Sequence, residues 1–199
     1  MGERLNIEVV KGNKLLANSY YHWSGYSNCA VNLTIEIVES FEYIKKYKVD
    51  NVKNKDILLA IRLLEATGAG TNESQISNTI KTIGLIDTNV EIKKCKGRDE
   101  GIIEISEEGM NENRSWEESR VTIDIENQKI NFEAYQEIDE EDKKYYEEEA
   151  VEFKNINVDF NNIKFEDIFD LKAFIDKNYY NSQYFFKNEF DNKYISLIL

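Results

Sequence analysis

Seven consecutive residues, Tyr20 to Tyr26, carry the side chains best suited to chemistry or ligand binding. The segment Tyr-Tyr-His-Trp-Ser-Gly-Tyr contains the single histidine, one of the two tryptophans and three of the twelve tyrosines. Such a group can stack on a planar ligand and offer hydroxyl and ring N–H groups to it, as small-molecule pockets do. Aromatic residues also fill covered central strands. The segment therefore predicts either a ligand pocket or part of the core.

The pocket hypothesis adds two arginines from the second half of the chain. A guanidinium group can bind a phosphate through two parallel hydrogen bonds, although ion pairs that hold loops together are a commoner use. Trp116 and Glu117, near the second arginine, are either contact residues or packing residues. The candidate ligand-binding residues are Tyr20, Tyr21, His22, Trp23, Tyr26, Arg98 and Arg114.

Two nucleophilic arrangements would use His22. Cys29 lies near the start of a predicted helix, where the helix dipole lowers a thiol pKa and a nearby imidazole can take its proton. Ser24 or Ser27 would give a serine nucleophile, but the sequence has no Gly-x-Ser-x-Gly elbow. No acid or amide that would orient the imidazole can be singled out. The sequence favours a non-enzymatic protein, and we predict no catalytic residue.

Metal and phosphate motifs are incomplete in this sequence. Zinc needs three or four nitrogen or sulfur ligands, whereas Cys29, Cys95 and the histidine are far apart along the chain. The carboxylates Asp139 to Asp142 lack the spacing and central glycine of an EF-hand. The segment Gly68 to Thr71 lacks the lysine of a P-loop. We therefore predict no metal and no cofactor, and two free cysteines.

The negative charge lies in the second half of the chain. The net charge is −13, to which residues 1–96 contribute +2 and residues 97–199 contribute −15. This asymmetry is typical of a charged interaction surface, although acidic runs are often only solvated. A negative surface repels the nucleic-acid backbone and complements the basic groove of a nucleic-acid enzyme. We expect a basic protein or nucleoprotein complex as the partner, with no direct binding of nucleic acid.

The candidate partner-binding residues are carboxylates downstream of Lys96. They are Asp99, Glu100, Glu107, Glu108, Glu117, Glu118, Asp139, Glu140, Glu141, Asp142, Glu147, Glu148 and Glu149. The acidic stretch from Glu137 to Glu152 is predicted to be either an exposed helix or a loop.

Length and composition predict one folded domain spanning residues 1–199. The chain has 41% hydrophobic residues, no internal repeat and no proline- or serine-rich linker. Its apolar runs reach four or five residues, whereas a membrane span needs about 20. Glu3 and Asn6 interrupt the start, where a secretory signal has an apolar stretch. We expect a cytoplasmic protein without a membrane segment.

Apolar periodicity predicts the fold class as α+β around one core. A β-hairpin turning at Lys11 to Lys14 opens the chain, and its second strand, apolar or aromatic on both faces, should be central. The predicted helices begin at Asn28, Asn54, Asn72 and Phe165 or Glu166, and the later strands are 90–92, 101–105, 121–125 and 130–134. The hairpin precedes a helical middle (about 28–84), an antiparallel meander (about 89–136) and an acidic, aromatic part with the C-terminal helix (137–199).

Four segments carry a resemblance to a known group of proteins. They are Met1 to Glu8, Tyr21 to Tyr26, Gly101 to Ser106 and Arg114 to Glu118. These segments resemble uncharacterised proteins carried by phages and prophages of low-GC bacteria. Acidic phage proteins of this size include anti-CRISPR and anti-restriction inhibitors. The resemblance therefore implies a phage-type inhibitor of host defence that acts in the host cytosol.

Overall fold

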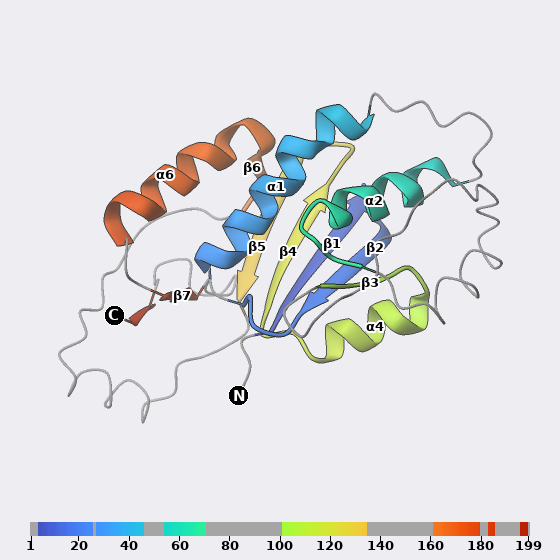
Figure 1. Cartoon of the computed structure of the whole chain (residues 1–199), viewed down its shortest axis with the longest axis horizontal. Coiled ribbons are helices and arrows are strands. Elements are labelled where there is room, and N and C mark those ends of the chain that lie inside the picture. Colours follow the sequence, from blue (N-terminus) through green and yellow to red (C-terminus); the bar gives the residue numbers. More distant parts are fainter. Residues whose placement is uncertain are drawn as a thin grey trace.

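A computed structural model describes residues 4–25, 27–45, 54–70, 101–134, 161–179, 183–185 and 196–198. In this part of the chain a mixed six-stranded sheet is combined with four α-helices, which confirms the α+β class (Figure 1). None of these helices is long and apolar enough to span a bilayer.

The predicted hairpin is confirmed as the centre of the sheet. β1 (Leu5–Lys11) pairs antiparallel with β2 (Lys14–Tyr21). Gly12 adopts a φ of +57° in the turn, a conformation that glycine reaches at little cost. β2 lies between β1 and another strand, as its two apolar faces predict.

The full strand order is β3-β2-β1-β4-β5-β6. The added strands are β3 (Ile102–Glu104), β4 (Ser119–Asp124), β5 (Lys129–Ala134) and β6 (Ile163–Lys164). β4, β5 and β6 form an antiparallel run, whereas β4 pairs parallel with β1. β3 is separated from this run because it pairs with β2 on the other side of the hairpin.

Helices cover one face of the sheet. α1 (Ser27–Lys45) and α2 (Lys55–Glu65) pack together, and α6 (Ile168–Tyr179) follows the short 3-10 helix η1 (Phe165–Asp167) and packs beside α1 (Figure 1). The ring of Phe41 in α1 meets Phe165 edge-on, with centroids 5.2 Å apart. These helices confirm the predicted starts near residues 28, 54 and 165.

The remaining described elements lie outside this layer. α4 (Glu107–Ser115), which the sequence did not predict, connects β3 to β4, and β7 (Gln183–Phe185) pairs with β8 (Ser196–Ile198). The predicted helix from Asn72, the predicted strand 90–92 and the acidic stretch 137–152 lie outside the described residues.

Strand alternation gives the sheet one apolar face and one polar face. Leu5, Ile7 and Val9 are fully buried and point to the helices, where they join Val121 and Phe132 in the core. Burying such side chains contributes about 1.5–3 kcal/mol each to folding. The residues between them, at every second position, point to the opposite face.

Tyr21, at the end of β2, belongs to the helix-covered face. Its hydroxyl lies 3.0 Å from the Ser19 hydroxyl and 2.5 Å from the Thr67 hydroxyl, and its ring is 2% exposed. Gly101 packs against the ring so closely that an added Cβ would lie 2.4 Å from Cε1. Burial raises the pKa of Tyr21 to about 12.

The raised pKa of Tyr21 predicts an alkaline loss of stability. An unfolded tyrosine has a pKa of about 10, so this contribution is fully present below that pH and is lost as the pH rises towards about 12. Between pH 9 and 11 the parent protein should lose about 1.4 kcal/mol more unfolding free energy than Tyr21→Phe. Urea denaturation at both pH values measures this difference. Equal losses in the two proteins would show that Tyr21 does not cause it.

Candidate functional site

The sheet face opposite α1, α2 and α6 is lined by polar side chains and one exposed apolar residue, Ile102. Strand pairing places them in two rows across the sheet. The first row is Ile102, Tyr20, Asn6, Arg120 and Glu133, and the second is Glu104, Asn18, Glu8, Thr122 and Asn131. A buried polar group needs a partner, since losing its hydration without one costs about 1–3 kcal/mol. The partners define the candidate site.

Glu8 lies at the centre of this face and is only 2% exposed. Arg114 of α4 donates to it twice, with Nε 2.5 Å from Oε1 and Nη2 2.9 Å from Oε2. This bidentate arrangement is the strong form of an arginine–carboxylate interaction. The hydrogen bonds and charge of Glu8 raise the pKa of Arg114. A charge in β1 is thus neutralised by a residue more than a hundred positions later.

A second pair extends this network. Arg120 of β4 forms an ion pair with Glu117 through Nε and Nη2, and its Nε lies 3.7 Å from Oε1 of Glu8. Asn6 Nδ2 donates to Glu117 Oε2 at 2.8 Å and to Glu8 Oε1 at 3.3 Å. Burial raises the pKa of Glu117, against the lowering effect of its bonds to Arg120 and Asn6. We call Asn6, Glu8, Arg114, Glu117 and Arg120 the polar network.

The orientation of the Asn6 amide follows from this network. Its NH₂ group faces two carboxylates, so exchanging the amide oxygen and nitrogen would bring like partial charges together. The amide oxygen is buried and has no hydrogen-bond partner. An ordered water molecule is the usual partner of such an atom, so this oxygen alone does not define a ligand site.

Further contacts attach α4 to the polar face. Asn18 Nδ2 donates to the Met110 carbonyl at 3.0 Å, and Asn113 Nδ2 donates to Asn18 Oδ1 at 2.9 Å. Gly109 lies so close to Glu104 that an added Cβ would be 2.4 Å from Oε2. Ser106 caps the helix by accepting the Gly109 N–H at 3.1 Å. The inner side of α4 is therefore fixed by polar contacts as well as by Met110.

Aromatic residues gather where β1 and β4 begin and β2 ends. The ring of His22 meets Trp23 edge-on at 4.9 Å, and its Nδ1 lies 3.2 Å from the Tyr20 hydroxyl. The Arg4 guanidinium lies 5.8 Å from the ring centroid of Trp116. Trp23 and Trp116 are 48% and 56% exposed. Tyr20, His22, Trp23, Arg4 and Trp116 form what we call the aromatic edge.

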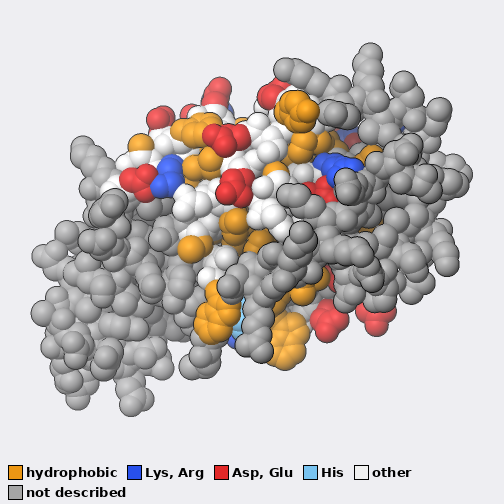
Figure 2. All heavy atoms as spheres, viewed as in Figure 1, with side chains coloured by type: hydrophobic (Ala, Val, Ile, Leu, Met, Phe, Trp, Pro, Cys, Tyr) orange, Lys and Arg blue, Asp and Glu red, His pale blue; other side chains and the backbone are white. Residues whose placement is uncertain are grey.

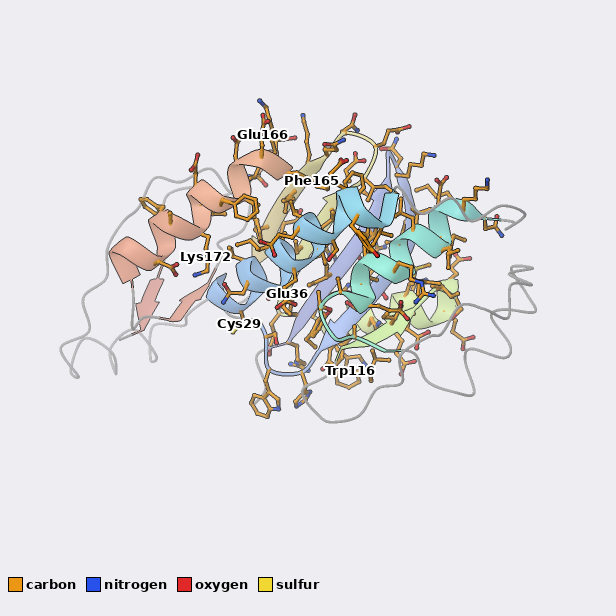
Figure 3. The ribbon with its side chains drawn as sticks, turned by 45° about the horizontal axis from the view of Figure 1, so that its top comes forward. Cys29, Glu36, Trp116, Phe165, Glu166 and Lys172 are labelled. Carbon is orange, nitrogen blue, oxygen red and sulfur yellow. The ribbon has the colours of Figure 1, made fainter. Side chains whose placement is uncertain are left out.

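Two observations place the members of the aromatic edge near one another. Burial raises the pKa of Tyr20, and the charges of Arg4 and Glu118 also act on it. Glu118 accepts from Arg4 at 2.7 Å and 2.8 Å. Figure 2 shows hydrophobic side chains on both sides of the histidine on this part of the surface, and Figure 3 shows the exposed position of Trp116.

The predicted ligand-binding residues divide among different environments. Tyr20, His22 and Trp23 lie at the aromatic edge, whereas Tyr21 is in the core on the other face of the sheet. Arg114 lies in the polar network. Tyr26 and Arg98 are outside the described residues.

The predicted partner-binding residues also divide. Glu107 and Glu108 are exposed in the first turn of α4, whereas Glu117 and Glu118 are paired with arginines. Asp99, Glu100, Asp139, Glu140, Glu141, Asp142, Glu147, Glu148 and Glu149 lie outside the described residues. Sequence reasoning missed Asn6 and Glu8, whose only signal is a polar residue at every second position of an otherwise apolar strand.

Neither catalysis nor metal binding gains support from this part of the chain. Burial raises the pKa of the Cys29 thiol, which is opposite to the shift that a Cys–His nucleophile needs. Among the described residues, no three histidine, cysteine or acidic side chains are grouped to hold a metal ion.

Comparisons with protein-family models, curated proteins and solved structures gave no match to this chain.

The polar network predicts a specific cost for removing Arg114. Arg114→Ala leaves the buried Glu8 carboxylate without its main partner, which should lower the unfolding free energy by about 2–3 kcal/mol. That value is below the usual cost of breaking a buried pair because the Arg114 side chain is 38% exposed. Urea denaturation measures the loss.

Lys172→Ala is the matched control, because it breaks the exposed Lys172–Asp176 pair of α6. This change should cost about 0.5 kcal/mol or less. Similar losses in the two variants would contradict a special role for the Glu8–Arg114 pair.

Proposed function

We propose that this protein is a non-enzymatic, phage-type inhibitor that binds a basic surface of a bacterial defence or nucleic-acid-processing complex. The observation that supports this proposal is how the charges are divided between interior and surface. All four described arginines, Arg4, Arg62, Arg114 and Arg120, form ion pairs with carboxylates. None of them is fully exposed, and the exposed charged side chains of the described residues are eleven carboxylates and five lysines.

The exposed lysines gather at the end of the strands where the β1–β2 hairpin turns, which we call the lysine edge. They are Lys11, Lys14, Lys55, Lys129 and Lys164. Lys11 and Lys14 flank the hairpin turn, and Lys11 bonds to Asp56 next to Lys55. Lys129 and Lys164 are partners in the β5–β6 pair. The described surface away from this edge therefore has few cations to offset its carboxylates.

Most exposed carboxylates belong to three α-helices and the short 3-10 helix η1. They are Glu36, Glu39 and Glu42 on α1, Glu107, Glu108 and Glu112 on α4, and Glu166, Asp167, Asp170 and Asp176 on η1 and α6. Burial and the neighbouring charge of Glu39 raise the pKa of Glu36, as expected for carboxylates on one helix surface. Acidic groups are spread over the helical face in Figure 2.

Such a surface favours a basic partner over nucleic acid. Complementary potentials speed encounter and select the partner, and their effect falls as salt screens the charges. We call the surface formed by α1, η1 and α6 the helical face. It combines carboxylates from both halves of the sequence, so the partner-binding surface that we propose extends beyond the acidic second half.

Charge reversal on the helical face tests this proposal. The triple variant Glu36→Lys, Glu39→Lys, Asp170→Lys should slow association with the partner complex by about tenfold or more at low salt. Capture from bacterial lysate at about 0.05 M and 0.5 M salt, with identification by mass spectrometry, provides the partner, and surface plasmon resonance gives the rates.

The control variant Lys11→Glu, Lys14→Glu alters the lysine edge instead, and should not slow association. A nucleic-acid-processing complex that is retained equally by the parent protein and the triple variant would refute binding through the helical face. Retention that does not depend on salt would argue against charge as its basis.

A further inference from the structure

α4 carries a second, more specific set of exposed side chains on its outer side. Glu108, Glu112 and Trp116 follow one another at intervals of four residues, which places them on one helix face about 6 Å apart per step. Glu108 and Glu112 are exposed, and so is Trp116 at the C-cap. We call these three residues the α4 stripe.

The α4 stripe is not used to attach the helix to the sheet. Met110, Asn113 and Arg114 make those contacts from the opposite side of α4. Within the described residues, Glu108 and Glu112 form no ion pair. A helix fixed on its inner side therefore offers two carboxylates and one indole to a partner at little cost in conformational entropy.

One member of the stripe, Trp116, already contacts an arginine of the protein itself. Arg4 lies 5.8 Å from the ring centroid of Trp116 while its guanidinium is paired with Glu118 at 2.7 Å. An indole and a carboxylate thus act together on one arginine. Trp116 is still 56% exposed, and Glu112 lies one turn before it. The exposed indole surface and Glu112 offer the same two kinds of contact to a second guanidinium.

Arginine suits this surface better than lysine. A guanidinium is planar, stacks on aromatic rings and forms two parallel bonds to a carboxylate, whereas an ammonium is a compact and strongly hydrated charge. A cation placed over an indole is attracted by the negative face of the ring, and more strongly where water is excluded. Tryptophan and arginine are also the residues that most often dominate the energy of protein interfaces.

We propose that the α4 stripe binds an arginine-rich, extended segment of a protein partner. Alternate residues of an extended strand lie about 6.6 Å apart, close to the step between members of the stripe. A segment with arginine at every second position therefore aligns one guanidinium with Trp116 and Glu112 and the next with Glu108. The inference rests on the proposed function only in taking the partner to be basic.

Calorimetric titration of the full chain with two synthetic peptides tests this inference. The peptides are four Arg-Ser repeats and four Lys-Ser repeats, which have equal charge. The arginine peptide should bind several-fold more tightly than the lysine peptide. Trp116→Leu should weaken arginine-peptide binding about fivefold and remove the preference, since the cation–π contribution is lost. Glu112→Gln should weaken binding of both peptides.

Two matched variants serve as controls. Trp23→Leu removes the other exposed tryptophan, and Glu126→Gln removes an exposed carboxylate of the β4–β5 turn, outside both proposed binding surfaces. Each should change arginine-peptide affinity by less than about twofold. Circular dichroism confirms that every variant is folded.

Two results would overturn the inference. Equal affinity for both peptides, weakened equally by Glu126→Gln and Glu112→Gln, would show general charge attraction, which leaves the proposed function intact. Trp116-dependent binding of adenosine monophosphate without binding of the arginine peptide would make the stripe part of a small-molecule site. If only the proposed function were wrong, no partner complex would be captured from lysate, but the protein would still prefer the arginine peptide over the lysine peptide.

Discussion

The bidentate contact between Glu8 and Arg114 is the constraint on which the polar side of this molecule depends. A carboxylate that is 2% exposed in the middle of a sheet requires a cation. The neighbouring strand β4 offers only Arg120, whose Nε lies 3.7 Å from Glu8 Oε1. Arg114 meets this requirement from α4, so the helix must lie across the β1–β2–β3 part of the sheet. Gly109 then allows the close approach to Glu104. The position of α4 in turn determines where Trp116 is exposed.

Pairing of arginines with buried or half-buried carboxylates also determines the charge of the surface. Arginines that neutralise interior or half-buried carboxylates no longer balance the exposed ones, and the exposed lysines lie together at the hairpin-turn edge. Carboxylates therefore dominate α1 and α6 on one side and α4 on the other. Among the described residues, the exposed carboxylates of the second half lie mainly on α4, η1 and α6, and α1 adds carboxylates of the first half.

Local signals were enough to predict much of the fold. Gly12 between alternating apolar residues predicted the hairpin, and Asn54 with Gly68 marked the limits of the region that contains α2. α4 was missed because Met110 is its only large apolar residue, so it has no apolar stripe; its remaining signal is the Ser106 cap followed by two acidic residues. The parallel β1–β4 pair and the Glu8–Arg114 contact were not predictable, since both join residues over a hundred positions apart.

Hydrogen exchange of α4 tests most directly whether the Glu8–Arg114 contact positions this helix. The measurement compares backbone amide exchange in Glu8→Gln with the parent protein, using β4 as an internal reference. Residues 110–115 should lose protection while Val121 and Ile123 keep theirs, because the core side of the sheet is unchanged. Unchanged protection of α4 would show that Met110 and the other contacts hold the helix in place without the Glu8–Arg114 pair.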